Sequence, residues 1–355
     1  MNQLKISVLA GDGIGQEVVP GALSVLEAVR ELTGSFVLKT VDYPWSCEWY
    51  AHHGEMMPSD GLTRLEDSDA ILLGAVGFPG VPDHVSLRGL LIPIRQAFQQ
   101  YANVRPIQLW PGVTGALVGK GPEDLDILCI RENTEGEYSG SGGVIEVAGL
   151  GRVATQVSVF TEPGIERIAR YAMEQASRRG GMVASATKSN ALQYTAVLWD
   201  DVVLRVARDF PEVTVTSYHV DALAARFVSA PESLDVVVGS NLFGDILTDL
   251  GAALQGSLGL AASANLNPER RFPSMFEPVH GSAPDIAGRG VANPVGAIWS
   301  AAMMLDHLGE QEAAGLVTKS LRSTIGAGIR TPDMGGSAST GDVVDAVVGG
   351  LVGAD

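Results

Sequence analysis

Residues 4–32, LKISVLAGDGIGQEVVPGALSVLEAVREL, decide the fold class of this chain. They run from an apolar strand through Gly11, Gly13 and Gly15 into an amphipathic helix. A glycine turn of this kind lets a pyrophosphate approach the N-terminus of a helix. The dinucleotide pattern G-x-G-x-x-G, however, requires its third glycine at position 16, which is Gln16 here. The stretch therefore predicts a strand, a turn and a helix, and a Rossmann site remains the alternative, with Asp42 as its acid.

Short apolar strands and helical patterns alternate along almost the whole chain. Strands are expected at 4–9, 36–42, 69–73, 103–109, 125–131, 182–186, 213–219 and 235–239. Helices are expected at 14–32, 87–101, 162–178, 195–210, 242–254, 294–308 and 311–325. This alternation is typical of an α/β fold with a largely parallel sheet. The chain has 355 residues, more than the roughly 250–300 that one core supports, so two domains are expected.

Composition excludes several classes of partner. The formal net charge of −17 argues against nucleic acid and anionic membranes, since both need a basic surface. No apolar run approaches the roughly 18 residues of a membrane span, and the first residues lack a secretory leader pattern. We therefore expect a cytoplasmic protein in which Cys47 and Cys129 are structural.

Residues 138–160, YSGSGGVIEVAGLGRVATQVSVF, interrupt the alternation. Apolar and polar residues alternate there around glycines, which predicts a β-hairpin. Because a protruding hairpin has exposed edges, we expect it to pair with a second subunit.

Arginines lie near the ends of several predicted elements. Arg88 and Arg95 are seven residues apart, which predicts one helical face, and Arg105 heads the next strand. Arg131 ends the strand LDILCIR. Guanidinium groups bind carboxylates in a bidentate manner, so these side chains are candidates for a dicarboxylate site. Surface ion pairing in an acid-rich protein is the alternative.

Two aspartates, Asp245 and Asp249, share one face of the helix that follows the strand LDVVVG. Asp221 also follows a strand. Carboxylates without His or Cys suit Mg²⁺ or Mn²⁺. Acids that only stabilise the start of a helix are the alternative.

Tyr138 and Lys188 are candidates for a general acid and a general base, although each also fits an ordinary structural or surface role.

The loop MFEPVHGSAPDIAGRGVANPVGAI contains His280, Asp285 and Asn293 among many turn residues. Such a loop can wrap an adenine and a ribose. The pattern alone does not separate this role from a structural one.

Together these segments resemble the β-decarboxylating dehydrogenase family, the metal-dependent enzymes that oxidise isocitrate, 3-isopropylmalate, tartrate and D-malate. The motifs NVRP, RENTEGEY, TKSN, SNLFGDILTDL and EPVHGSAPDIAGRGVANP occur in that order. The likeness is strongest to the tartrate/D-malate branch, through DYPWSCEWYAHHGEMMP, VPDHVSL and SANLNPER.

The resemblance implies a two-domain α/β fold of the isocitrate/isopropylmalate dehydrogenase type, with a mixed, largely parallel sheet, and not a Rossmann fold. It implies a cofactor-binding domain of residues 1–102 and 257–355 and a dimerisation and substrate/metal domain of residues 103–256. The hairpin at about 138–160 would be the intersubunit arm of a homodimer with shared active sites.

The resemblance also implies NAD- and metal-dependent oxidative decarboxylation of a malate-type 2-hydroxy dicarboxylic acid. Lys188 would take the hydroxyl proton, and Tyr138 would protonate C3 after CO₂ is lost. Lys188, Asn190 and Asp221 would come from the partner subunit. The expected substrate ligands are Arg95, Arg105 and Arg131, and the expected ligands of Mg²⁺ or Mn²⁺ are Asp221, Asp245 and Asp249.

The expected cofactor is NAD, because an acid at Asp285 would bind a ribose 2′-hydroxyl and repel a 2′-phosphate. A monovalent cation such as K⁺ stays an open addition. The residues implied in cofactor binding are Asn190, His280, Gly281, Ser282, Ala283, Asp285, Ile286 and Asn293.

One position departs from the tartrate/D-malate pattern, which expects Trp where this chain has Arg88. The hypothesis is that Arg88 favours a malate with a polar or acidic C3 substituent; contact with solvent or with cofactor phosphates is the alternative. A 3-isopropylmalate dehydrogenase is the alternative function. A non-catalytic regulatory subunit is disfavoured, because Tyr138, Lys188 and the three aspartates are all present.

Overall fold

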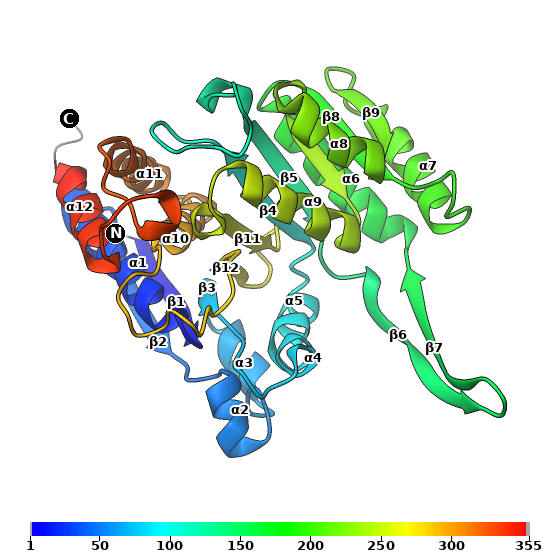
Figure 1. Cartoon of the computed structure of the whole chain (residues 1–355), viewed down its shortest axis with the longest axis horizontal. Helices are drawn as coiled ribbons and strands as arrows, with labels where there is room; N and C mark the ends of the chain where they lie inside the picture. The colour runs from blue at the N-terminus through cyan, green and yellow to red at the C-terminus, as the bar shows by residue number, and fades with distance from the viewer. Residues whose placement is uncertain (1, 353–355) are drawn as a thin grey trace. The chain divides into compact units, whose positions relative to one another are not determined.

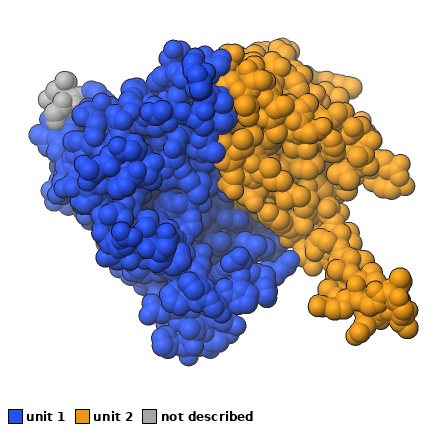
Figure 2. Space-filling model, viewed as in Figure 1, with its two compact units in different colours: residues 1–100, 105–125, 252–355 blue, residues 101–104, 126–251 orange. Residues whose placement is uncertain are grey.

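The computed structural model describes residues 2–352, and the chain divides into two compact units. Unit 1 comprises residues 1–100, 105–125 and 252–355, and unit 2 comprises residues 101–104 and 126–251. Figure 2 colours the two units separately. Unit 1 is thus assembled from three segments, the last of which is separated from the second by residues 126–251 of unit 2.

Unit 1 contains a mixed sheet in the order β2-β1-β3-β12-β11. Its strands are β1 (Asn2–Gly11), β2 (Phe36–Asp42), β3 (Ala70–Ala75), β11 (Ala262–Leu266) and β12 (Ser274–Pro278). Neighbouring strands are parallel except for β11 and β12, which are antiparallel. Every residue of β3 and β11 is buried, as expected for strands covered on both faces.

Helices surround this sheet. They are α1 (Gly15–Thr33), α2 (Cys47–His53), α3 (Gly61–Glu66), α4 (Asp83–Ser86), α5 (Ile92–Ala97), α10 (Val295–His307), α11 (Gln311–Gly326) and α12 (Thr340–Val352). Figure 1 shows α1, α11 and α12 grouped together. Helix α10 is buried on nearly all sides, whereas α1 buries one stripe that includes Val18, Ala22 and Val29. Helix α1 ends at Gly34, whose φ of 59° only glycine adopts easily.

Unit 2 contains a parallel sheet in the order β5-β10-β8-β9. Its elements are β5 (Asp126–Glu132), α6 (Glu162–Ser177), β8 (Met182–Thr187), α7 (Thr195–Ala207), β9 (Thr214–His219), α8 (Val220–Ser229), β10 (Val236–Gly239) and α9 (Asn241–Leu254). Strand β4 (Ala102–Gln108) has residues in both units. Helix α6 begins as its sequence predicts, because the Thr161 hydroxyl accepts a hydrogen bond of 3.0 Å from Gly164 N.

Strands β6 (Gly136–Val147) and β7 (Gly151–Val159) form a separate antiparallel hairpin. The hairpin extends away from the rest of unit 2 in Figure 1. Its apolar side chains Val144, Ile145, Leu150 and Val157 are all more than half exposed. Among residues 2–352 the two strands pair only with each other, so the ribbon has unpaired edges and an exposed apolar face. Two isolated strands are only marginally stable in water.

The mixed, mostly parallel α/β arrangement confirms the predicted fold class. All eight predicted strands are present. The antiparallel pair β11–β12 and the short helices α2, α3, α4 and α8 are not among the predicted elements. The helix expected at 87–101 instead contains a π-helical turn, η1 (Leu87–Leu91), before α5. Among residues 2–352, no helix is long and apolar enough to cross a membrane.

Candidate active site

A cluster of three side chains in unit 2 joins β5, β6 and α9. The guanidinium of Arg131 forms an ion pair with Asp245 Oδ1. The phenol of Tyr138 donates a hydrogen bond of 3.0 Å to the other oxygen, Asp245 Oδ2. Arg131 also lies over the Tyr138 ring, with 5.4 Å between its guanidinium carbon and the ring centroid. A cation, a carboxylate and a phenol predicted from separate motifs therefore meet at one point.

Arg131 is held in place by its neighbours. Its side chain is only 3% exposed, and its Nε and Nη2 donate to Asn241 Oδ1 at 3.1 and 2.7 Å. Gly244 permits this close approach, because a Cβ there would lie 2.5 Å from the Cβ of Arg131. The glycine that precedes Asp245 is thus required by packing of α9 against β5.

The environment of Tyr138 favours its protonated form. Burial raises the pKa of the phenol above its usual value of 10.0, and the neighbouring Asp245 carboxylate raises it further. The cation of Arg131 acts in the opposite direction. Tyr138 therefore keeps its proton near neutral pH, as a general acid must.

Glu137, which was not among the residues predicted from the sequence, fixes the start of α9. Its carboxylate accepts hydrogen bonds from Ser240 Oγ at 2.8 Å and from Leu242 N at 3.0 Å. A carboxylate at the positive N-terminus of a helix is favourable. Glu137 thereby ties the base of the hairpin, next to Tyr138, to the helix that carries Asp245.

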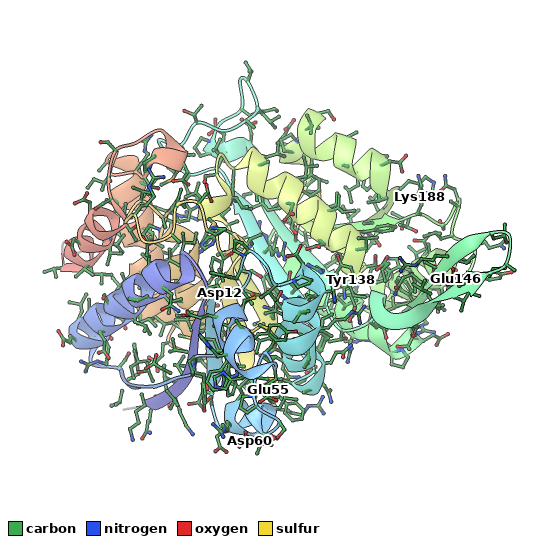
Figure 3. The ribbon with its side chains drawn as sticks, turned by 60° about the horizontal axis from the view of Figure 1, so that its bottom comes forward. Asp12, Glu55, Asp60, Tyr138, Glu146 and Lys188 are labelled. Carbon is green, nitrogen blue, oxygen red and sulfur yellow. The ribbon has the colours of Figure 1, made fainter. Side chains whose placement is uncertain are left out.

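A second pair in unit 2 consists of Lys188 and Asp221. Lys188 Nζ donates to Asp221 Oδ1 at 2.6 Å, and this bond lowers the pKa of the Asp221 carboxyl below its usual value. Asp221 lies in the first turn of α8, and Asn190 is exposed just after β8. Figure 3 shows Lys188 apart from Tyr138. Within one chain these side chains therefore form two separate groups. The predicted acid, Tyr138, belongs to one group, and the predicted base, Lys188, belongs to the other.

The three predicted metal ligands are also divided between these groups. Asp245 and Asp249 lie one turn apart on α9, with Asp249 exposed, whereas Asp221 is paired with Lys188. Within the described part of the chain, no three His, Cys, Asp or Glu side chains are placed to hold one ion. The two α9 carboxylates still offer the oxygen donors that Mg²⁺ and Mn²⁺ prefer.

Two predicted substrate ligands, Arg95 and Arg105, are buried in unit 1. Arg95 is 8% exposed and donates from Nη2 to Glu277 Oε1 at 2.8 Å. Its buried Nε has no hydrogen-bond partner among residues 2–352. Arg105, on β4, is also buried. Two of the three expected carboxylate ligands therefore lie in the interior of this unit, and one has unused donor capacity.

Arg88 does not share a face with Arg95, although a spacing of seven residues predicts that it should. Arg88 is exposed and Arg95 is buried. The π-helical turn at Leu87–Leu91 explains the difference, because its i→i+5 hydrogen bonds widen the turn and rotate the preceding residues. Such turns are frequent at functional sites.

The glycine turn that opens the chain supports the loop that follows β12. Ile14 N donates to Ser282 O at 2.8 Å, and a Cβ at Gly13 would lie 2.0 Å from the same oxygen. Glu17 accepts hydrogen bonds from the backbone N–H groups of Gly288 and Gly290. The turn and the start of α1 are therefore structural supports of the 280–290 loop.

Asp12, within that turn, is a second residue that the motif analysis missed. It is 4% exposed and accepts backbone hydrogen bonds from Cys47, Glu48 and Gly77 at 2.9, 3.2 and 3.0 Å. Burial, together with this carboxylate, raises the pKa of the Cys47 thiol to about 12. Figure 3 labels Asp12. Asp12 thus links the glycine turn to the start of α2 and to the residues that follow β3, and Cys47 is an inert structural cysteine.

The 280–293 loop has the features expected of a site for an adenosine group. Burial lowers the pKa of His280, so its imidazole is neutral, and its buried Nε2 has no partner among residues 2–352. Asp285 and Gly281 are exposed, and Ile286 and Ala283 are partly exposed. An orphaned imidazole nitrogen beside exposed loop residues fits a bound nucleotide.

Asn293 has a different place in this loop. Its Oδ1 accepts a hydrogen bond from Val295 N at 3.0 Å, at the start of α10, and its Nδ2 donates to Asp333 at 2.9 Å. Ser282, also buried, contributes its carbonyl to the contact with Ile14. The Asn293 side chain and the Ser282 carbonyl therefore hold the loop in shape.

Comparison with known proteins agrees with this fold. The model of the isocitrate/isopropylmalate dehydrogenase family matches residues 5–347. The chain therefore belongs to this family and is an oxidoreductase, which confirms the resemblance found in its motifs.

Particular relatives refine this assignment. The chain is 51% identical to an Escherichia coli protein named D-malate dehydrogenase (decarboxylating), with 98% of each chain covered. It is 49% identical to a probable tartrate dehydrogenase/decarboxylase of Agrobacterium vitis, over 100% of this chain and 99% of the relative. Among solved structures, isocitrate dehydrogenase from Methylococcus capsulatus matches with a TM-score of 0.87 and 34% identity, covering 99% of both chains.

Proposed function

We propose that this protein catalyses the NAD- and divalent-metal-dependent oxidative decarboxylation of a malate-type 2-hydroxy dicarboxylic acid. The observation that carries the proposal is the cluster of Arg131, Asp245 and Tyr138, which combines a carboxylate-binding cation, a metal-binding anion and a protonated acid. The names of the D-malate and tartrate relatives support the same reaction class.

Each side chain of the cluster has a role that follows from its environment. Arg131 is fixed by Asn241 and offers a positive charge to a substrate carboxylate. Tyr138 holds a proton at its phenolic oxygen, ready to be given to C3 once the β-carboxylate has left. Asp245 orients both groups.

Asp245 and Asp249 would hold the metal ion, with Asp221 contributed by a second copy of the chain. When bound, Mg²⁺ or Mn²⁺ would acidify the substrate hydroxyl, and NAD would accept a hydride from C2. Lys188 would take the hydroxyl proton at Nζ. Its bond of 2.6 Å to Asp221 keeps the two side chains of the partner's contribution together.

The hairpin of β6 and β7 provides the physical reason for a homodimer. Val144, Ile145 and Val157 are exposed on a ribbon whose strands pair only with each other among the described residues. Pairing with the same ribbon of a second copy would bury these side chains and satisfy the strand edges. Ile145→Asp should therefore shift the protein from dimer to monomer in light scattering and abolish turnover.

We infer that the cofactor is NAD and that its adenosine is held by the 280–293 loop. The exposed Asp285 carboxylate would accept a hydrogen bond from the ribose 2′-hydroxyl and repel a 2′-phosphate. Asp285→Asn should raise the KM for NAD. An unchanged KM would instead favour the glycine turn at residues 11–15 as the cofactor site.

Arg88 carries the proposal for the substrate substituent. Its guanidinium is exposed in the π-helical turn and forms no ion pair among residues 2–352, so its charge is available to a ligand. We propose that it favours a malate with a polar or acidic group at C3 over unsubstituted D-malate. A buried apolar substituent, as in 3-isopropylmalate, gains nothing from this cation. Equal turnover of D-malate by wild type and Arg88→Trp would count against the assignment.

A substrate panel tests the proposed function. D-malate, L- and meso-tartrate, 3-isopropylmalate, isocitrate and C3-substituted malates are each incubated with NAD and Mn²⁺, and NADH and CO₂ are measured together. Equal amounts of the two products from a malate-type acid support the proposal. NADH without CO₂ would indicate a plain 2-hydroxyacid dehydrogenase, and no NADH from any acid would favour a binding subunit.

A further inference from the structure

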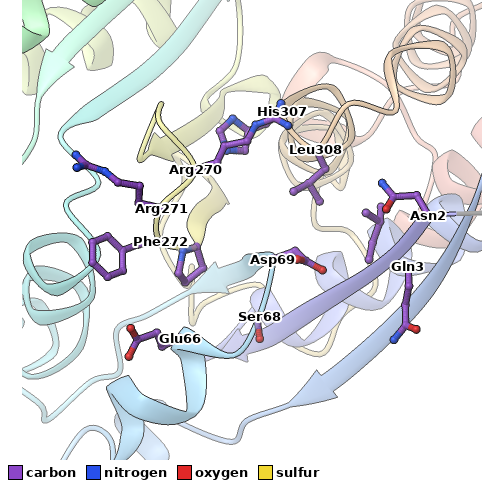
Figure 4. A pocket seen from close by; sticks show the side chains of 12 residues that line it. Asn2, Gln3, Glu66, Ser68, Asp69, Arg270, Arg271, Phe272, His307 and Leu308 are labelled. Carbon is purple, nitrogen blue, oxygen red and sulfur yellow. The ribbon is translucent and has the colours of Figure 1, made fainter.

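Unit 1 contains a polar cavity at the starting ends of β1, β3 and β12, whereas the 280–293 loop follows the end of β12. The volume of the cavity is about 260 Å³. This is several times the roughly 30 Å³ of one water and slightly below the lower limit of pockets for drug-sized ligands. Figure 4 shows Asp69, Arg270 and His307 among the side chains around it. The cavity is large enough for a small metabolite.

A rigid turn places Arg270 at this cavity. The buried Asn267 side chain accepts hydrogen bonds from Arg271 N at 2.8 Å and Phe272 N at 3.4 Å, and Asn267 N donates to Ser274 Oγ at 3.0 Å. Arg270 itself has a φ of 54°, which is unfavourable for a residue with a Cβ. An arginine with a strained backbone, in a turn held by several hydrogen bonds, is a reason to look for a ligand.

The charges that line the cavity do not neutralise one another. The guanidinium of Arg270 forms no ion pair or hydrogen bond among residues 2–352. The Asp69 carboxylate accepts one backbone hydrogen bond, from Lys5 N at 2.7 Å, and pairs with no cation in that range. Arg271, by contrast, is near Glu269 at 3.9 Å. Glu66 also lines the cavity and forms no ion pair among residues 2–352. One unpaired cation, Arg270, and two unpaired carboxylates, Asp69 and Glu66, therefore line the same space.

His307 does not supply a second positive charge. Burial and the nearby Arg270 lower the pKa of its imidazole to about 4, and its Nε2 lies 3.1 Å from Ser274 Oγ. The cavity thus offers Arg270 to a negative group, and the carboxylates of Asp69 and Glu66 to a positive group.

We propose that this cavity binds a small zwitterion of the amino-acid class, with the ligand carboxylate on Arg270 and its ammonium group on Asp69. A zwitterion pairs with Arg270 and Asp69 at once, and Glu66 adds a second carboxylate on the side of its ammonium group. It also carries no net charge, so the formal charge of −17 on the chain does not repel it as it repels a dianion. The site uses none of the residues assigned to the proposed reaction.

The test measures binding to the full chain without substrate, NAD or metal. Each of the common L-amino acids is screened by thermal shift, and those that raise Tm are titrated by calorimetry. The proposal predicts saturable one-to-one binding of at least one of them. Arg270→Gln and Asp69→Asn should each weaken that binding at least tenfold. Asn retains an oxygen that accepts from Lys5 N, so Asp69→Asn should fold normally.

Two further variants separate binding from folding. Arg270→Gly relieves the positive φ, so it should melt no lower than wild type and still lose binding. Arg64→Gln, which removes a surface arginine paired with Asp60, is the matched control and should bind normally. The proposal is overturned if no amino acid binds, if binding survives both charge-removing variants, or if inorganic phosphate binds while zwitterions do not.

Discussion

Tyr138 and Asp245, 107 positions apart in the sequence, are joined by a hydrogen bond of 3.0 Å from the phenol to the carboxylate. The same carboxylate is paired with Arg131 through its other oxygen. Asp245 therefore links the proposed proton donor to the proposed substrate-binding cation, and the proposed reaction depends on this link.

Replacing Tyr138 by Phe should remove the proton donor and leave the Arg131–Asp245 pair intact. We expect kcat to fall by roughly 10²–10⁴, the usual contribution of a general acid, with a small change in KM. Steady-state formation of NADH measures this effect. Tyr218→Phe, which loses a hydroxyl elsewhere in unit 2 and keeps its ring beside Arg226, is the control. Wild-type kcat in Tyr138→Phe would remove Tyr138 from the mechanism.

Replacing Glu277 by Gln should leave the buried Arg95 cation without a counter-charge. Both side chains are nearly buried, at 12% and 10% exposure, so we expect unfolding in urea to become easier by about 3 kcal/mol. The exposed pair of Glu27 and Arg30 provides the contrast, and Glu27→Gln should cost less than about 1 kcal/mol. Equal effects of the two substitutions would show that the Arg95 pair is not a buried ion pair in solution.

Removing the Glu17 side chain should affect the cofactor loop. Glu17→Ala loses both hydrogen bonds to the backbone of Gly288 and Gly290, so the loop becomes less ordered. NAD would then have to order the loop when it binds, and this cost reduces the net binding energy. We therefore expect the KM for NAD to rise by roughly 3- to 10-fold at nearly constant kcat. Glu27→Gln, on the same helix, should leave the KM for NAD unchanged. A Glu17→Ala enzyme with normal KM would place NAD away from this loop.

His307 should make stability fall in acid. Its pKa is lowered from 6.5 to about 4 in the folded state, so between these values the unfolded chain binds a proton that the folded chain does not. The contribution of His307 is therefore complete above pH 6.5 and is lost as the pH falls through about 4, by at most ~1.4 kcal/mol per pH unit. Urea unfolding at several pH values should show this slope, and His307→Gln should reduce it. An identical slope in the variant would disprove the assignment to His307.

The sequence predicts the parts of the site that depend on local spacing. The strand at 125–131 and the helix that carries Asp245 follow from hydrophobic periodicity. The helix expected at 162–178 is confirmed as α6, and the Thr161 hydroxyl caps its first turn.

Contacts between segments that are distant in the sequence could not be predicted without the structure. No local pattern shows that Arg131 reaches Asp245, that Glu277 pairs with Arg95, or that Glu137 fixes the start of α9, because each contact depends on how strands and helices pack. The prediction that Arg88 and Arg95 share one helical face was wrong. The π-helical turn at Leu87–Leu91, which contains Arg88, has no simple sequence signal. Strands β11 and β12 were missed because they are short and flank a turn.

The glycine turn at residues 11–15 also has a different role from the one that its pattern first suggests. The absence of glycine at Gln16 argued against a dinucleotide fingerprint, and the structure shows Gly13 and Ile14 packed against Ser282 instead. The turn supports a loop some 270 residues later, and that loop carries the residues proposed for NAD.

The most direct test of the proposed reaction is the ratio of CO₂ to NADH while metal is restored to chelator-treated enzyme. We expect no turnover of the best malate-type substrate after EDTA treatment, and equal amounts of NADH and CO₂ as Mn²⁺ is added back to wild type. Asp245→Asn should stay inactive at the same Mn²⁺ concentrations. NADH formed without CO₂, or turnover that is unchanged by removal of metal, would contradict metal-dependent oxidative decarboxylation.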